Sequence, residues 1–223
     1  MNGSRLVLQV ARSAGKIIHW LGAALIVAAC SGNELGPAAT NASAPITQTQ
    51  IDGTIHVCTS CHGFGGRSVS PNFPVLAGQR AGYIEAELKA FRDHERADRN
   101  ARTYMWGMAA YSSDAMIHAI AVYFSSQKPE VHPPAAQPVM AAGEKIFHQG
   151  LPTKKVPACQ SCHGVHGQGI GPIPRLAGQH AEYIAKQLNY FALNERQDPI
   201  MRADAKDLTP AEIEAVSAYA AAQ

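Results

Sequence analysis

The sequence lacks a surplus of charge of either sign. Its 223 residues contain 19 lysines and arginines against 17 aspartates and glutamates, and only 16% of the chain is charged. Proteins that bind nucleic acid usually carry a strongly basic domain or a basic patch. This balance therefore argues against nucleic acid as a partner, and an apolar content of 46% argues against wholesale disorder.

Acidic residues are absent from the first 29 positions, where Arg5, Arg12 and Lys16 precede the apolar run IIHWLGAALIVAA. A cationic segment before a short apolar run is the plan of a secretory signal, and this run is too short to span a bilayer comfortably. It ends in VAAC, which resembles the site where bacterial lipoproteins are cut and lipidated. We expect residues 1–29 to be a lipoprotein-type signal peptide and Cys30 to carry lipid. A plain signal peptide cut nearby and an uncleaved anchor are the alternatives.

Cysteine is also scarce, with five in the chain, and four of them form two CxxC pairs. Each pair is followed by histidine, in CTSCHG from Cys58 and CQSCHG from Cys159. A disulfide framework usually has dispersed cysteines. A zinc ribbon places its two pairs about 15–20 residues apart, and a thioredoxin-like site needs a βαβ pattern. Neither condition is met, because nearly a hundred residues separate the pairs and no segment shows sustained β alternation.

The remaining interpretation of CxxCH is a c-type haem attachment site. In such a site the two sulfurs form thioether bonds to the haem vinyl groups, and the adjacent histidine binds iron. Two covalently bound haem c groups are therefore the expected cofactors. The expected attachment sets are Cys58, Cys61 and His62 for one haem, and Cys159, Cys162 and His163 for the other.

The chain is an internal duplication. The stretch FPVLAGQRAGYIEAELKAFRDHER starts at Phe73, and IPRLAGQHAEYIAKQLNYFALNER starts at Ile173, one hundred residues later without a gap. In each half we expect a helix leading to CxxCH, a glycine-rich loop, an amphipathic helix and a polar loop with methionine. A closing helix capped by Ser113 or Thr209 should end each half. The predicted fold is all-α, with two tandem small helical domains.

A segment rich in proline, SSQKPEVHPPAAQPV, separates the halves and cannot form a helix interior. It predicts an extended linker, whereas the Ala-, Thr- and Asn-rich residues before the first half predict a flexible tether. The predicted boundaries are a tether at 30–48, an N-terminal domain at 49–128, a linker at 129–138 and a C-terminal domain at 139–223.

The sixth iron ligand can be sought with the register of the duplication. Met201, the only methionine after Cys159, lies eight residues before Thr209, and Met105 lies eight residues before Ser113. These two methionines are therefore the predicted ligands. Methionine or histidine there would make an electron carrier, and an open position would suggest oxygen or peroxide chemistry. The other histidines, any of which could replace methionine, are His56, His94, His118, His132, His148, His166 and His180.

The chain resembles the di-haem class I cytochromes c of the c4 type, over roughly residues 50–223. The resemblance rests on CxxCHG, P-x-L-A-G-Q, Y-x-x-x-x-L-x-x-F, the repeated methionine and the closing A-x-Y helix. It implies two packed cytochrome c domains with neighbouring haems and His/Met ligation of each iron. It also implies that the carbonyl oxygens of Pro74 and Pro174 orient the axial imidazoles. The repeated Arg96 and Arg196 could neutralise a haem propionate or lie at a solvated helix end.

The expected function is that of a periplasmic, membrane-tethered electron shuttle without a small-molecule substrate or catalytic residues. It would take electrons from a quinol-oxidising complex or dehydrogenase and pass them to an acceptor such as a terminal oxidase. A permanent cytochrome subunit of a flavoprotein or alcohol dehydrogenase complex is one alternative. A small haem peroxidase is the other, and it requires one iron to lose its methionine.

Overall fold

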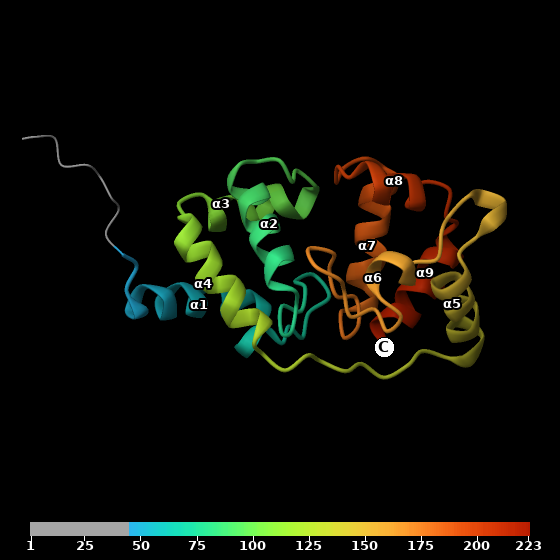
Figure 1. The fold of residues 1–223 in the computed structure, drawn as a ribbon, viewed down its shortest axis with the longest axis horizontal. Coiled ribbons are helices and arrows are strands. Elements are labelled where there is room, and N and C mark those ends of the chain that lie inside the picture. The colour runs from blue at the N-terminus through green and yellow to red at the C-terminus, as the bar shows by residue number, and fades with distance from the viewer. Residues whose placement is uncertain (1–44) are drawn as a thin grey trace, which may run out of the picture. The chain divides into compact units, whose positions relative to one another are not determined.

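A computed structural model describes residues 45–223, whose regular secondary structure is helical, with long loops between the helices (Figure 1). The described residues contain no β-strand, only an isolated bridge between Leu151 and Val156, so the predicted all-α class is confirmed. The predicted signal peptide at 1–29 and Cys30 lie outside the described residues. Within 45–223, no helix is long and apolar enough to cross a membrane.

The first half begins with a long helix that contains the whole first CxxCH motif at its end. Its elements are α1 (Gln48–His62), a 3-10 turn (Phe64–Gly66), α2 (Ala81–Arg92), a π-helical turn (Ala101–Met105), α3 (Trp106–Ala109) and α4 (Asp114–Ser125).

The second half repeats this order, but its first helix is split. Its elements are α5 (Gln137–Gln149), a 3-10 turn (Pro152–Lys154), α6 (Gln160–His163), α7 (Ala181–Ala192), α8 (Pro199–Ala205) and α9 (Pro210–Ala221). The inserted residues HQGLPTKKVP cause the split, because Gly150 ends α5 with a φ of 69° and the bridged loop follows. The second CxxCH motif therefore lies mostly on a separate short helix. The extended linker ends two residues earlier than predicted, where α5 begins.

The closing helices start where the sequence predicts. The Ser113 hydroxyl accepts the backbone N–H of Met116 at the start of α4. Thr209 and Glu212 form a complete capping box at the start of α9. A second capping box, between Thr47 and Gln50, fixes the start of α1. Such caps satisfy backbone donors that have no partner inside the helix.

The methionine segments were predicted as polar loops, and this prediction is wrong. Met105 is the last residue of the π-helical turn, and Met201 lies in the first turn of α8. Asp198 caps α8 by accepting the backbone N–H groups of Ile200 and Met201, each at 2.9 Å. The following Pro199 suits the first helical position, because its missing N–H would have no partner there.

Each half has its own apolar core, and the first cysteine of each motif packs against it. The first core contains Ile84, Ile120 and Phe124, and Cys58 lies at its side. The second core contains Ile146, Phe147, Ile184 and Val216, with Cys159 beside it. The cores therefore place the two motifs with respect to α2 and α4 in one half, and α7 and α9 in the other.

Candidate haem sites

The two motif histidines occupy equivalent positions at the ends of α1 and α6. His62 and His163 are each only 7% exposed. The Nδ1 of His62 lies 2.9 Å from the carbonyl oxygen of Pro74, and the Nδ1 of His163 lies 3.0 Å from that of Pro174. A carbonyl can only accept a hydrogen bond, so Nδ1 carries the proton in both rings. The Nε2 of each ring then carries a lone pair that can bind a metal.

Burial keeps both imidazoles neutral. It lowers the pKa of His62, and the hydrogen bond to Pro74 opposes this only in part. It also lowers the pKa of His163, against the opposing effects of Pro174 and Asp204. Neutral imidazole is the form that binds metals, and a bond from its second nitrogen fixes the ring orientation. Both histidines are therefore prepared as ligands by the same contact.

The four motif cysteines form no disulfide. Cys58 and Cys159 are half-buried, whereas Cys61 and Cys162 are exposed. Burial raises the pKa of the Cys58 thiol, and it raises that of Cys159 to about 11. Among residues 45–223, no group of three or more His, Cys, Asp or Glu side chains is placed to hold a metal ion. The cysteines are thus paired within each motif but not gathered into a zinc site.

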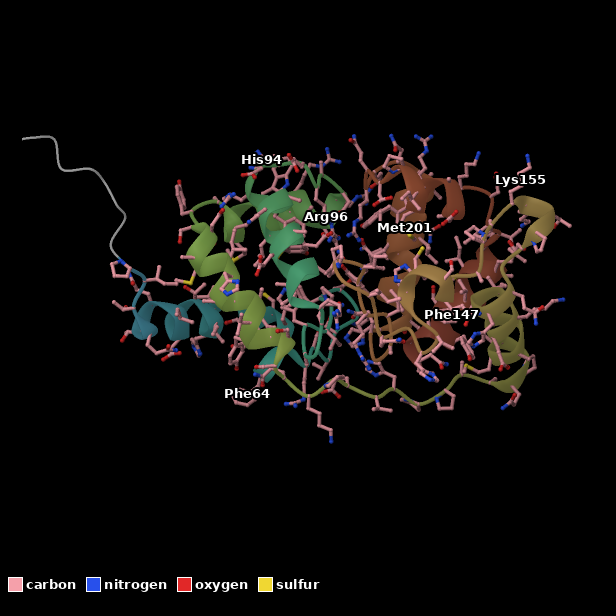
Figure 2. All side chains as sticks on the ribbon, in the orientation of Figure 1. Phe64, His94, Arg96, Phe147, Lys155 and Met201 are labelled. Carbon is pink, nitrogen blue, oxygen red and sulfur yellow. The ribbon has the colours of Figure 1, made fainter. Side chains whose placement is uncertain are left out.

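Met105 and Met201, which occupy equivalent positions of the duplication, both lie beside buried parts of the structure. Met105 packs against the cluster of Phe91, Ala101 and Ala109, whereas the nearby Met108 is 62% exposed. Met201 is half-buried on α8 (Figure 2). On the same helix, Asp204 raises the pKa of both His163 and Cys159, so α8 lies near the second CxxCH motif.

Three of the other histidines have partners elsewhere. His118 is exposed and lies 2.7 Å from Glu85. His148 bridges Gln160 and Tyr219, each at 2.8 Å, and so joins α5, α6 and α9. His94 stacks on the indole of Trp106. These contacts explain the positions of the three imidazole rings, so that binding to an iron is not needed to explain them.

The side chains of two repeated glutamines, Gln79 and Gln179, form hydrogen bonds with the main chain of the opposite half. The sequence alone does not predict these contacts. Gln179 accepts the N–H of Val75 at 2.9 Å and donates to its carbonyl oxygen at 3.0 Å. In the reverse direction, Gln79 accepts the N–H of Arg175 at 2.7 Å and donates to its carbonyl oxygen at 2.9 Å. Each glutamine side chain therefore pairs with the main chain like one residue of a β-strand, at the position just after Pro74 or Pro174 of the other half.

The repeated arginines meet in a buried cluster between α2 and α7. Arg96 and Arg196 are each 8% exposed, so the prediction that allowed a solvated helix end is wrong. Both guanidinium groups pair with the single carboxylate of Glu87, and both donate to the side-chain oxygen of Gln187. Figure 2 shows Arg96 on the side of the first half that faces α7. Glu87 and Gln187 are equivalent positions of the duplication, so alignment of the two halves could have shown this exchange of a carboxylate for an amide.

Three further groups complete this cluster. The hydroxyl of Tyr83 accepts from Arg196 at 3.0 Å, and that of Tyr183 accepts from Arg96 at 3.4 Å. Burial raises the pKa of Tyr83 to about 12, so its phenol is neutral. Asp98, which is fully buried, accepts from Arg96 at 2.8 Å.

The residues of each motif fit a covalent haem. Each motif offers two unpaired thiols one helical turn apart, and a neutral imidazole whose Nε2 is free of hydrogen-bond partners. This is the donor set of a c-type site, in which histidine is the ligand on one side of the iron.

Comparison with known proteins agrees with these sites. The model of the cytochrome c family matches the chain twice, at residues 54–128 and 140–221. The chain belongs to the cytochrome c family. It is similar to cytochrome c-552 of Acidithiobacillus ferridurans, with 46% identity over 73% of this chain and 71% of the relative. It is also similar to a thiosulfate dehydrogenase electron acceptor of Thiomonas intermedia, with 38% identity over 74% of this chain and 78% of the relative.

Two solved structures are similar as well. The cytochrome c4 structure of Acidithiobacillus ferrooxidans has a TM-score of 0.71 and 44% identity, over 74% of this chain and 98% of that one. The thiosulfate dehydrogenase TsdBA of Marichromatium purpuratum has a TM-score of 0.64 and 29% identity, over 73% of this chain and 35% of that one. The chain is thus a di-haem cytochrome c of the c4 type that binds two covalent haem c groups. It is an electron carrier rather than an enzyme.

Proposed function

We propose that each half holds its haem with the residues selected from the sequence. Cys58 and Cys61 form the thioether bonds of the first haem, and His62 and Met105 bind its iron. In the second half, the thioethers come from Cys159 and Cys162, and the iron ligands are His163 and Met201. The observation that carries this proposal is the pair of buried, neutral motif imidazoles, each with Nδ1 bonded and Nε2 free.

A bound haem supplies a one-electron Fe(III)/Fe(II) couple, and the chain's own residues set the conditions for it. The carbonyl oxygens of Pro74 and Pro174 hold the imidazole planes, which fixes the direction of each Nε2. A methionine thioether, from Met105 or Met201, would raise the reduction potential as the second protein ligand. The apolar cores beside Cys58 and Cys159 shield one attachment cysteine of each haem from water, whereas Cys61 and Cys162 are exposed. These features suit repeated one-electron exchange without a bound substrate.

The methionine ligands can be tested by substitution. Ferric haem with a methionine ligand shows a weak charge-transfer band in the red. We expect Met105→Ala and Met201→Ala each to remove about half of this band, since each would affect one of two haems. Met108→Ala is the matched control, because Met108 lies in the same region as Met105 but is exposed, and it should leave the band unchanged. A full band in either ligand variant would show that this methionine does not bind iron.

We further propose that the electron donor is either a thiosulfate dehydrogenase or a quinol-oxidising complex. We propose a terminal oxidase as the electron acceptor. The similarity to a thiosulfate dehydrogenase electron acceptor supports the first assignment. Phe64, which follows the first motif by two residues, is 86% exposed and suits a small apolar contact with a partner there (Figure 2). A carrier that must dissociate quickly uses small interfaces.

The donor assignment can be tested by rapid mixing of the oxidised protein with a reduced thiosulfate dehydrogenase. We expect haem reduction within the turnover time of the enzyme. The rate should change with ionic strength, because charges at the rim of a transient interface steer the encounter. No reduction by this enzyme at any ionic strength would exclude it as the donor.

A permanent subunit of a dehydrogenase complex is a second candidate. It is favoured by the similarity of this chain to about a third of the chain of the thiosulfate dehydrogenase TsdBA. Purification of the native protein under mild conditions distinguishes the two. A shuttle should elute alone, whereas a subunit should elute with a large partner in constant ratio.

We also propose the tethered arrangement predicted above, with a signal peptide at 1–29, a lipidated Cys30, a tether at 30–48, and cytochrome domains at 49–128 and 139–223. The support is the VAAC sequence after the apolar run. Expression with a labelled fatty acid should label the wild-type protein in the membrane fraction. Cys30→Ser should abolish the label, and a labelled variant would place the anchor elsewhere.

A further inference from the structure

Two histidines outside the haem sites lie side by side where the linker meets the second half. His132 belongs to the linker, which Figure 1 shows as an extended segment between α4 and α5, and His180 directly precedes α7. The centroids of their imidazole rings are 5.2 Å apart, and the ring planes are tilted by 31°. Within residues 45–223, the Nε2 atom of each ring is buried and has no hydrogen-bond partner. A buried polar atom without a partner costs free energy, so two of them at one place need an explanation.

The main chain holds both histidines in place. The linker packs closely on the second half, because a Cβ at Gly178 would collide with the carbonyl oxygen of Glu130. Glu130 also pairs with Arg67 of the first half, at 2.9 Å. These contacts fix the chain two residues before His132 and two residues before His180. The proline that follows His132 then keeps its backbone extended, because a residue before proline avoids the helical region.

The two rings line one pocket, which lies among the linker, the start of α7 and the end of α9. Its volume is about 220 Å³. Its other walls include the small side chains of Ala181 and Ala218 and the exposed Glu182. A water molecule takes about 30 Å³ in the liquid, so the pocket has room for an ion and several water molecules. It therefore combines two unpaired imidazole nitrogens, one carboxylate and space for water.

We propose that His132 and His180 form a binding site for a divalent transition-metal ion, with both Nε2 atoms as ligands and water completing the coordination. Imidazole is a ligand that suits zinc, copper and nickel ions. Metal–nitrogen bonds of about 2.0–2.1 Å place an ion about 3 Å from the centre of each ring. Two rings that share one ion can then have centroids at most about 6 Å apart. The observed separation of 5.2 Å lies inside this limit.

The charges around the pair suit a cation that binds neutral imidazole. Burial and the neighbouring His132 lower the pKa of His180, and the negative charge of Glu182 opposes this only in part. The ring of His180 is therefore neutral at neutral pH and has a lone pair available for a metal. Glu182, at the wall of the pocket, also favours a cation over an anion there.

An ion at this site would tie the linker to the second half. The site has two protein ligands, so it should bind more weakly than a structural zinc site with four. An ion that binds the folded chain in preference to the unfolded one also raises the stability of the fold. The pair shares no residue with the haem sites, so this inference does not depend on how the irons are ligated.

The test is calorimetric titration of the oxidised, haem-loaded protein with Cu²⁺, which binds such sites more tightly than the other divalent ions of its row. We expect one ion per chain in the wild type. His132→Asn and His180→Asn should each weaken binding by about tenfold or more, since loss of even an outer-shell partner costs about 10–100-fold. The electron paramagnetic resonance spectrum of the bound Cu²⁺ should show two imidazole nitrogens in the wild type and one in either variant.

His118→Asn is the matched control, because His118 is exposed and also lies beside a carboxylate, 2.7 Å from Glu85. It should leave Cu²⁺ binding unchanged. Cu²⁺ should raise the Tm of the wild type and of this control, but not that of the two ligand variants.

Binding that survives both ligand substitutions, or that is lost in His118→Asn instead, would overturn the inference. So would a wild type that binds no Cu²⁺, since the two rings would then share only buried water. If a ligand variant fails to fold, as seen by circular dichroism, the spectrum of the wild type decides, because a bound Cu²⁺ without two imidazole nitrogens contradicts the site.

Discussion

The crossing glutamines offer a direct measurement of how strongly the two halves hold each other. Gln179→Ala removes the acceptor and the donor that bind the main chain of Val75. Gln79→Ala removes the equivalent pair from the main chain of Arg175. The two variants delete the same chemical group at equivalent positions, so their difference reports on the surroundings alone.

The surroundings predict unequal losses. Val75 is 4% exposed, so its N–H and carbonyl group would stay buried without partners after Gln179→Ala. A net hydrogen bond contributes about 1 kcal/mol, and a buried unpaired group costs about 1–3 kcal/mol. We therefore expect a loss of about 3 kcal/mol for Gln179→Ala. Arg175 is only half-buried, so water can replace Gln79, and we expect about 1–2 kcal/mol there.

The assay is thermal unfolding of the haem-loaded proteins at neutral pH, followed by far-ultraviolet circular dichroism. For a protein of this size, 3 kcal/mol corresponds to a fall in Tm of about 6–12 °C. Gln137→Ala is the control, because Gln137 is exposed at the start of α5, and its Tm should stay within about a degree of the wild type. Equal losses for Gln179→Ala and Gln79→Ala would refute the argument from burial.

Two further changes test the packing and the buried charges. A Cβ at Gly143 would collide with the backbone oxygen of Ala215, so Gly143→Ala should force α5 from α9 and cost about 1–3 kcal/mol in denaturant unfolding. Gly53 has open space around it, and Gly53→Ala should instead stabilise by about 0.5–1 kcal/mol. Burial raises the pKa of Glu87, but the opposing effect of Arg196 and Arg96 is larger. The pKa is therefore lowered from its ordinary value of 4.5. Its stabilising contribution is then present above pH 4.5 and is lost as the pH falls through the lower folded-state pKa. The unfolding free energy should therefore fall more steeply below pH 4.5 in the wild type than in Glu87→Gln. Equal acid sensitivity of the two proteins would contradict this assignment.

Local signals in the sequence predicted the helical elements well. Ser113 and Thr209 act as caps because a hydroxyl before a helix satisfies a backbone donor wherever the helix goes. The methionine segments were predicted as loops although Asp198 and Pro199 form a recognisable helix start. The turn that ends at Met105 is π-helical and has no comparable local signal.

The contacts between the halves could not be predicted in the same way. Gln79 and Gln179 were visible as repeated polar residues, but nothing in the chain says that each binds the main chain of the other half. Arg96 and Arg196 looked equally suited to solvent, because a charged residue near a helix end is usually exposed. Only the approach of α2 to α7 buries them and gives them a common carboxylate.

The sequence alone determined the duplication, the all-α class, the two covalent haem motifs and the register that pairs Met105 with Met201. These follow from covalent chemistry and from the spacing of residues along the chain, and neither depends on the tertiary structure. The tertiary structure decided how the halves meet: the crossing glutamines, the buried arginines and the unequal charges of Glu87 and Gln187. Burial and proximity in space give these residues their effect, because water weakens interactions between charged groups at the surface but not between packed halves.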